Sequence, residues 1–269
     1  MDHRGFIEIQ SPWQSGRLEY HWIEGDPDQP TFILLHEGLG CVDLWKHFPK
    51  KLLEKTGWGV FSYSRFGYGR SDRCALPRTV DYMHREAEHL SVLLEQLNLE
   101  KVILLGHSDG ASIISIYAGS DVVREGRNAL LPRVSGLVLL APHFFVEDVS
   151  LDGIRTARHL FETTDLRQRL EKYHGEQVDD AFWGWNDVWL NPLFRNWTIC
   201  DFLDGITMPV LCLQGNQDEY GTIRQLEVLR EQTRGPVVIR VYEDCGHSPQ
   251  TEREQTVISD ISEFVMDIE

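Results

Sequence analysis

The sequence predicts an α/β fold, in which a mostly parallel, twisted sheet is covered by helices on both faces. Two observations predict it. Short apolar runs rich in Val, Ile and Leu alternate along the chain with longer stretches typical of helices. In addition, a Gly-x-Ser-x-Gly pentapeptide at residues 106–110 lies between an apolar run, 101–105, and a helical stretch, 111–118. A strand, a tight turn and a helix form the setting in which such a pentapeptide exposes its serine.

The predicted strands are short apolar runs, as expected for strands that are buried in a sheet covered on both faces. The first two, at residues 5–9 and 17–24, are interpreted as an opening hairpin. The others follow at intervals that leave room for a helix after most of them. They are residues 31–35, 59–63, 101–105, 134–140, 209–213 and 237–242.

Helices are predicted between these strands, which is the alternation that a mostly parallel sheet requires. They cover about residues 44–56, 80–98, 111–119, 223–233 and 252–267. One segment interrupts the alternation: residues 143–205 contain only helical patterns, at 154–163, 166–174 and 178–190. We therefore predict a core made of residues 1–142 and 206–269, with residues 143–205 as a helical insertion.

The pentapeptide predicts a catalytic serine, Ser108, and that serine needs partners, because a hydroxyl is a weak nucleophile at neutral pH. His247 follows a glycine after the last predicted strand, and Asp218 comes after the strand at 209–213. Open α/β sheets place their ligands at the carboxyl ends of strands. The order Ser, Asp, His along the chain is the order expected with this type of turn. Ser108, Asp218 and His247 are the predicted nucleophile, acid and base.

On these residues the chain resembles the α/β-hydrolase family, and the resemblance covers nearly all of it. Residues 36–40 (His-Glu-Gly-Leu-Gly) stand where the family has its oxyanion loop, although the family usually has His-Gly where this chain has Glu37. Residues 64–72 are similar to the family's Asp/Arg-x-x-Gly-x-Gly-x-Ser loop, which buttresses the site. The resemblance implies an oxyanion hole formed by the backbone N–H groups of Asp109 and Gly38.

The family also leaves alternatives for the acid. In some members the acid follows the preceding strand, where this chain has Glu147 and Asp148, and Asp244 is a weaker rival close in sequence to His247.

The resemblance further implies that residues 143–205 form a cap that roofs the pocket. Four of the eight tryptophans fall in this segment, namely Trp183, Trp185, Trp189 and Trp197. Packing between cap helices is one interpretation of them, and an apolar, aromatic-binding pocket is the other. We predict that substrate contacts His36, Leu39, His143, Trp183 and Trp185.

The composition excludes several other classes. The formal net charge of −16 disfavours nucleic acid or an anionic membrane as a partner. No apolar run approaches the ~20 residues needed to cross a bilayer, and residues 1–5 lack the pattern of a secretory signal. The five cysteines have no Cys-x-x-Cys spacing, which predicts reduced thiols in a cytoplasm. His84 and His89 are five residues apart and do not share a helix face, so they predict no metal site. The predicted triad needs no cofactor, and the Gly-x-Gly-x-x-Gly spacing of a dinucleotide site is absent.

The sequence therefore predicts a serine hydrolase that acts on a small carboxylic ester or a related acyl compound. The same residues could also cleave a carbon–carbon bond in a diketone, a lactone, an amide or an N-terminal prolyl peptide, because the fold does not decide among them. Two further alternatives come from the family: a slow-turnover ligand receptor and a cofactor-free oxygenase.

Overall fold

A sheet of eight strands, in the order β1-β2-β4-β3-β5-β6-β7-β8, runs through the computed structural model, which describes residues 1–124 and 130–268. β1 pairs antiparallel with β2, and β2 with β4; every other neighbouring pair is parallel. The strands are Asp2–Gln10 (β1), Ser15–Ile23 (β2), Thr31–Leu35 (β3), Val60–Tyr63 (β4), Lys101–His107 (β5), Arg133–Leu140 (β6), Val210–Gly215 (β7) and Val237–Tyr242 (β8). The predicted α/β class and its opening hairpin are thus present.

Helices cover both faces of the sheet because its central strands are apolar on both sides. Ile33 and Leu35 pack into one buried cluster together with α2, α3 and α9, whereas Phe32 and Leu34 pack into a second cluster with α1 and α11. These helices are Phe48–Thr56 (α1), Tyr82–Leu97 (α2), Asp109–Gly119 (α3), Arg224–Gln232 (α9) and Glu254–Asp267 (α11). The sheet is therefore the middle layer of three.

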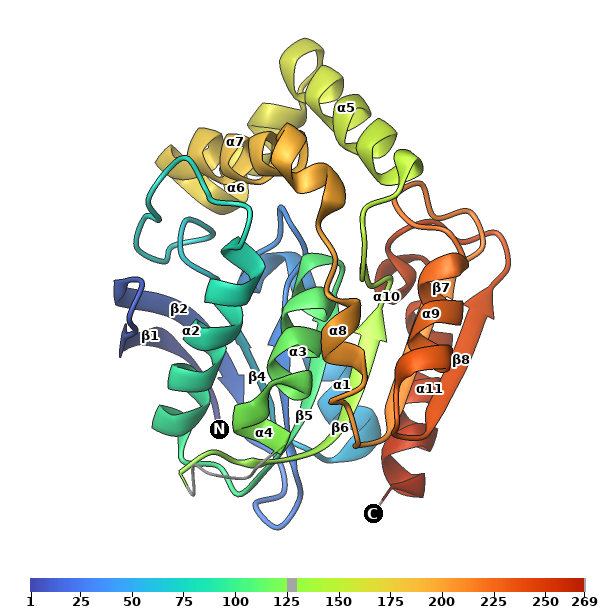
Figure 1. Ribbon diagram of the computed structural model, residues 1–269. Helices are drawn as coiled ribbons and strands as arrows, with labels where there is room; N and C mark the ends of the chain where they lie inside the picture. The colour runs from blue at the N-terminus through green and yellow to red at the C-terminus, as the bar shows by residue number, and fades with distance from the viewer. Residues whose placement is uncertain (125–129, 269) are drawn as a thin grey trace.

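Residues 143–205 contribute no strand to this sheet. They form Asp148–Thr163 (α5), Leu166–His174 (α6), Val178–Trp189 (α7) and the short Cys200–Leu203 (α8), with 3₁₀ turns at Gly175–Gln177 and Pro192–Asn196. An isolated antiparallel bridge between Phe145 and Thr198 joins the two ends of the segment. In Figure 1, α5, α6 and α7 lie above the end of the sheet at which β5, β6 and β7 finish. The helical content predicted here is correct, and the division into core and cap remains a prediction.

Two predicted helices are interrupted. The stretch 44–56 is a 3₁₀ turn, Val42–Trp45, followed by α1, because Lys46 between them adopts a positive φ of 51°. The stretch 252–267 is a short helix, Pro249–Glu252 (α10), followed by α11, because Arg253 leaves the helical region at φ −128° and ψ 34°. Two elements of four residues each, Asp121–Arg124 (α4) and α8, were not predicted, since one turn is too short to show a period.

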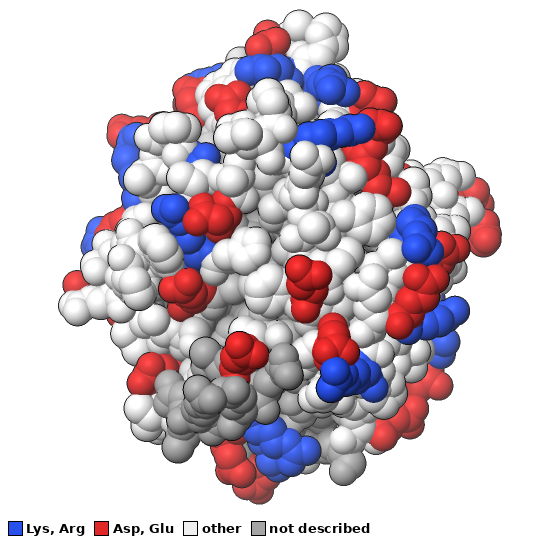
Figure 2. Space-filling view, in the orientation of Figure 1, with Lys and Arg blue, Asp and Glu red and all other residues white. Residues whose placement is uncertain are grey.

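The surface, the helices and the thiols add four observations. Acidic and basic side chains are interspersed on the face shown in Figure 2, around a broad uncharged area. Within residues 1–124 and 130–268, no helix has both the length and the apolar character needed to cross a membrane. The same residues contain no cluster of His, Cys, Asp and Glu that could hold a metal ion. All five cysteines are free thiols.

Candidate active site

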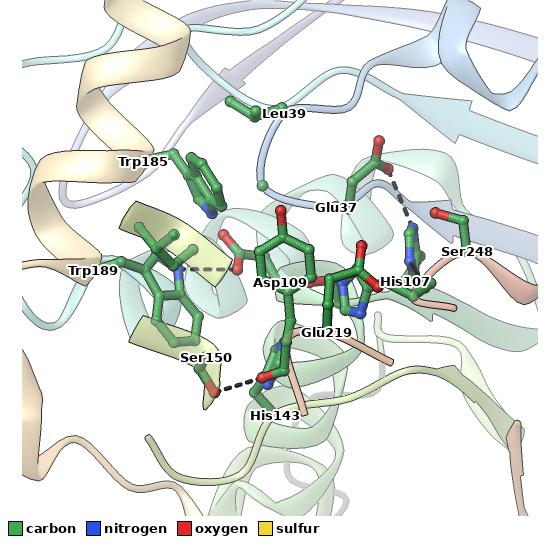
Figure 3. A pocket seen from close by; sticks show the side chains of 15 residues that line it. Glu37, Leu39, His107, Asp109, His143, Ser150, Trp185, Trp189, Glu219 and Ser248 are labelled. Atoms are coloured by element: carbon green, nitrogen blue, oxygen red, sulfur yellow. Dashed lines mark hydrogen bonds and ion pairs between the residues drawn. The ribbon is translucent and has the colours of Figure 1, made fainter. Parts of the chain in front are cut away.

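Ser108 occupies the sharp turn between β5 and α3. Its backbone has φ 53° and ψ −119°, a conformation that side-chain-bearing residues rarely adopt and that costs about 1–3 kcal/mol. The N–H of Ser108 donates to the carbonyl of Leu140 on the neighbouring β6 at 2.9 Å, which holds the strained turn against the sheet. The turn brings Ser108 to the wall of the cavity drawn in Figure 3.

The two glycines of the pentapeptide are required by close backbone contacts. A β-carbon on Gly106 would lie 2.5 Å from the nitrogen of Ala111, and one on Gly110 would lie 2.6 Å from the carbonyl carbon of Leu35. Both distances are shorter than close-packed atoms tolerate. A larger residue at either position would push α3 away from the sheet and displace Ser108. The pattern Gly-x-Ser-x-Gly is thus explained by packing.

His247 and Asp218 lie on the loops that follow β8 and β7, and their side chains meet. Nδ1 of His247 and Oδ1 of Asp218 are 2.8 Å apart. The same carboxylate oxygen accepts the backbone N–H groups of Tyr220 at 2.8 Å and Gly221 at 3.2 Å, so the loop itself orients the acid. With Nδ1 engaged, Nε2 of His247 is the ring nitrogen available to take a proton.

The pair shifts the pKa of both members. Burial disfavours the charged imidazole, but the charge and hydrogen bond of Asp218, with the charges of Glu219 and Glu37, outweigh it and raise the pKa of His247. Burial also opposes ionisation of Asp218, yet the charge and hydrogen bond of His247 outweigh it and lower the pKa of Asp218. The arrangement therefore stabilises an imidazolium beside a carboxylate.

The other candidate acids lie elsewhere. Glu147 accepts hydrogen bonds from the backbone and hydroxyl of Thr222 and from Nε2 of Gln225, so it organises the start of α9. Asp148 is exposed and pairs with Arg195 at 2.5 Å. Asp244 accepts a hydrogen bond from Gln217 at 3.3 Å. Among the four acids considered, only Asp218 contacts His247.

The loop after β3 is fixed by a buried arginine. The carbonyl of Glu37 accepts hydrogen bonds from Nη2 of Arg65 at 2.9 Å and from Nδ1 of His36 at 2.7 Å. Nε2 of His36 in turn accepts the backbone N–H of Arg65 at 3.0 Å, which leaves the proton on Nδ1. Because the C=O and N–H of a trans peptide point in opposite directions, the N–H of Gly38 points away from Arg65, and Gly38 lines the cavity.

The same arginine faces the second predicted oxyanion-hole residue. Nη2 of Arg65 is 4.0 Å from Oδ2 of Asp109, and both side chains are buried. Asp109 also accepts the hydroxyl of Tyr82 at 2.6 Å and Nε1 of Trp189 at 3.3 Å. Burial raises the pKa of Asp109, and the charge of Arg65 opposes that shift. One buried arginine thus supports both peptide segments from which the predicted donors come.

The cavity has a volume of about 240 Å³. Residues from the loops after β3, β5, β6, β7 and β8 form its floor and sides, and α5 and α7 supply the rest of the wall (Figure 3). The lining residues are Glu37, Gly38, Leu39, His107, Ser108, Asp109, His143, Ser150, Ile154, Trp185, Trp189, Glu219, Tyr220, His247 and Ser248. The structure therefore brings Ser108, His247, Gly38 and Asp109 to one cavity, with Asp218 directly behind His247.

Two of the predicted substrate-binding residues do not line this cavity. His36 is fully buried behind the loop, where it bonds Glu37 and Arg65. Trp183 faces away from the cavity: its ring packs edge-on against Phe161 and lies 5.0 Å from the guanidinium of Arg158. On α7 the residues that line the cavity are Trp185 and Trp189, four positions apart on one helix face. Leu39 and His143 do line it, and their contact with substrate remains a prediction.

Several lining residues were not predicted. Glu219 and Tyr220 directly follow Asp218, and the Tyr220 ring lies 4.7 Å from that of His247. Nε2 of His107, from the pentapeptide, is 2.8 Å from the carbonyl oxygen of His247. Their adjacency in sequence to Ser108 and Asp218 is the signal that could have found them. Burial raises the pKa of Glu37, but its pairing with His107 at 3.5 Å outweighs it, and the pKa falls to about 2.

Comparison with known proteins identifies the family. The model of the alpha/beta hydrolase family matches residues 32–260, and the chain belongs to that family. It is therefore a hydrolytic enzyme with the α/β-hydrolase fold. Solved structures of the same fold include a thermophilic esterase from Thermogutta terrifontis (TM-score 0.73, 18% identity, covering 98% of this chain and 99% of that one). An esterase from Exiguobacterium antarcticum is equally similar (TM-score 0.74, 20% identity, 97% and 99% covered).

Curated relatives span different chemistries. Epoxide hydrolase A of Mycobacterium tuberculosis is 23% identical, over 91% of this chain and 93% of the relative. A proline iminopeptidase of Saccharolobus solfataricus is 22% identical, over 87% and 84%. The bond that this chain cleaves therefore has to be argued from its own site.

Proposed function

We propose that this chain is a serine hydrolase that cleaves a small carboxylic ester, or a related acyl compound, through an acyl-enzyme intermediate. Ser108 is the nucleophile, His247 the general base and Asp218 the acid. The observation that carries the proposal is the 2.8 Å contact between His247 and Asp218 on the wall of the cavity that Ser108 also lines. A nucleophile, a base and a group that orients the base are the parts that acyl transfer requires.

The proposed reaction has two halves. Nε2 of His247 takes the proton of the Ser108 hydroxyl as the serine oxygen attacks the carbonyl carbon, and the carbonyl oxygen becomes an oxyanion. His247 then gives that proton to the departing alcohol, and the acyl group remains on Ser108. In the second half, His247 takes a proton from a water molecule, which attacks the acyl-enzyme and releases the acid and the free serine.

The backbone N–H groups of Gly38 and Asp109 are the proposed oxyanion donors. Each such donor is worth about 3 kcal/mol in the transition state, provided that it is held in place before the reaction. The hydrogen bonds from Arg65 and His36 to the Glu37 carbonyl supply this rigidity for Gly38. Apart from the substrate and the attacking water, these steps use only groups of the protein.

Labelling with a fluorophosphonate tests the nucleophile. The probe phosphonylates an activated serine and expels fluoride, so peptide mapping should find the modification on the peptide that contains Ser108. The variant Ser108→Ala should not be labelled, and Ser115→Ala, changed on the same helix but away from the cavity, should react like the wild type. Modification of a different serine, or of none, would refute the proposal.

An aminoacyl amide or ester is the second candidate substrate. Carboxylates of Glu37 and Glu219 line the cavity, and no lysine or arginine of the described residues does, so a protonated amine would meet a favourable potential. The proline iminopeptidase relatives support this candidate. The rates of hydrolysis of proline p-nitroanilide and of its N-acetyl derivative decide between the two candidate substrates. A preference for the free amine favours the aminoacyl substrate if Glu37→Gln and Glu219→Gln abolish that preference.

The remaining alternatives have their own tests. Steady-state turnover of any ester distinguishes an enzyme from a slow receptor, and oxygen uptake with aromatic substrates would reveal an oxygenase. We propose a small-molecule acyl substrate as the partner, rather than nucleic acid or membrane, because of the net charge of −16. The cytoplasmic location remains a prediction, based on the cysteine pattern.

A further inference from the structure

Trp185 on α7 has an unusual position for a packing tryptophan. Its side chain is 6% exposed, yet it lines the cavity, and in Figure 3 the nitrogen edge of its ring points into that cavity. The neighbouring tryptophan of the same helix face, Trp189, differs. Nε1 of Trp189 donates to the hydroxyl of Tyr82 at 3.1 Å and to Asp109 at 3.3 Å.

The nitrogen edge of Trp185 lies directly against Gly38. A β-carbon on Gly38 would lie 2.8 Å from Cε2 of Trp185 and closer still to Nε1. No side chain therefore fits at position 38 while the indole is in place. The indole N–H and the Gly38 peptide thus form adjacent parts of the wall of the cavity that Ser108 also lines.

The indole N–H of Trp185 has no hydrogen-bond acceptor among the described protein residues. Unlike those of Trp45 and Trp197, its Nε1 atom is not fully buried, because it is open to the cavity. Nε1 atoms of Trp45 and Trp197 also lack a partner, but neither of those rings lines the cavity. Trp185 therefore differs from the others in presenting a free donor to the space where the substrate would bind.

We propose that the indole N–H of Trp185 is a third donor of the oxyanion hole, beside the backbone N–H groups of Gly38 and Asp109. This inference rests on the proposed serine-hydrolase function. An indole nitrogen donates and does not accept, so it stabilises negative charge on the substrate oxygen without taking part in proton transfer. The donor comes from the helical segment 143–205, so docking of α7 onto the loop after β3 completes the catalytic site.

A different role for Trp185, as an apolar wall only, makes different predictions. A wall residue contributes to ground-state packing, so its truncation changes KM and the ranking of substrates. An oxyanion donor contributes only once the carbonyl oxygen becomes charged, so its loss lowers kcat with little change in KM.

Kinetics of Trp185→Phe separate the two roles, because this variant removes the N–H and keeps most of the ring. We expect kcat for a short p-nitrophenyl ester to fall about 10²-fold with KM changed less than about threefold. The matched control is Trp183→Phe, which alters the same helix outside the cavity and should leave kcat unchanged. A Trp185→Phe enzyme with wild-type kcat would overturn the inference.

Nuclear magnetic resonance on the wild-type protein provides a test that needs no active variant. The eight tryptophans give eight indole N–H signals. The signal that is absent from the spectrum of Trp185→Phe belongs to Trp185. If Trp185→Phe does not fold, Trp185→Leu serves for the same assignment. Reaction of Ser108 with a fluorophosphonate places a phosphonyl oxygen at the oxyanion position. We expect the Trp185 signal to move downfield and to exchange more slowly with water.

The two failures are distinguishable. If Ser108 is phosphonylated and the Trp185 signal does not move, the third donor is refuted and the serine-hydrolase function stands. If Ser108 is not phosphonylated at all, the proposed function fails and the inference fails with it.

Discussion

The sheet core and the helical segment 143–205 build the cavity in different ways. Ser108, Asp218 and His247 come from turns and loops directly after strands, and backbone hydrogen bonds hold the Ser108 turn and the Asp218 side chain in place. The segment contributes His143 at its start, Ser150 and Ile154 from α5, and two tryptophans from α7. The residues of α5 and α7 reach the cavity only because the helices pack over the end of the sheet (Figure 1).

One ion pair from each region shows a second difference, which is its burial. Arg65 and Asp109 in the core form a buried pair behind the site, and removal of one partner of such a pair typically costs about 3–5 kcal/mol. Pairs of the helical segment, such as Arg167 with Asp179, are on the surface, where an ion pair contributes little. If the proposed function is correct, we expect the core to carry the chemistry and the segment, Trp185 apart, to carry the selectivity.

Replacement of the core nucleophile should have the largest effect. Ser108→Ala removes one hydroxyl and should lower kcat for a short p-nitrophenyl ester by about 10⁴-fold or more, because the acyl-enzyme cannot form. The melting temperature should be unchanged or higher, because the substitution leaves the backbone of the strained turn in place. Ser115→Ala serves as the control. A variant that keeps a tenth of the activity in a preparation free of other esterases would contradict the assignment.

Replacement of Asp218, the proposed acid, should have the second largest effect on kcat. Asp218→Asn keeps the shape but favours the wrong tautomer of His247, and we expect a loss of about 10⁴-fold in kcat, as in the serine proteases. Glu147→Gln and Asp148→Asn should retain nearly full activity, because neither side chain contacts His247. The assignment is wrong if one of these two is severely impaired and Asp218→Asn is mild.

A change in the helical segment should alter selectivity more than rate. Ile154 and Leu151 are both buried on α5, but only Ile154 lines the cavity. Ile154→Ala should favour longer acyl chains in kcat/KM, with a change of about 1–3 kcal/mol in discrimination per methylene. Leu151→Ala should lower the melting temperature and leave the ranking unchanged. Identical rankings for both variants would remove the distinction between the two regions.

The smallest expected effect is a shift in pH dependence. His247 must be neutral to act as a base, and Glu219 is one of the charges that raise the pKa of His247. Glu219→Gln should therefore lower that pKa and move the acidic limb of the kcat/KM profile to lower pH. On the acidic limb, kcat/KM of the variant should therefore exceed that of the wild type. At alkaline pH, where His247 is neutral in both enzymes, the two values should agree. Glu54→Gln, on the distant α1, should not move the profile; an unmoved profile for Glu219→Gln would exclude the electrostatic role of that residue.

Much of the fold, and the positions of Ser108, Asp218 and His247 near one cavity, could be predicted from the sequence because the signals are local. The pentapeptide around Ser108 needs its glycines for close contacts that any version of this turn would make. Apolar runs identify the strands, and Asp218 and His247 follow two of them. Helix ends and interruptions, such as Lys46 with its positive φ, could not be predicted, because they depend on one or two torsion angles.

The side chains that line the cavity could not be predicted in this way. The sequence by itself determined an α/β sheet with a Gly-x-Ser-x-Gly turn and with an aspartate and a histidine after later strands, because turns and buried strands are encoded by a few consecutive residues. Only the tertiary structure decided that Trp185 faces Gly38 while Trp183 faces Arg158, and that Arg65 supports both oxyanion segments. These contacts join residues distant in the chain, and their geometry follows from how helices and loops pack together.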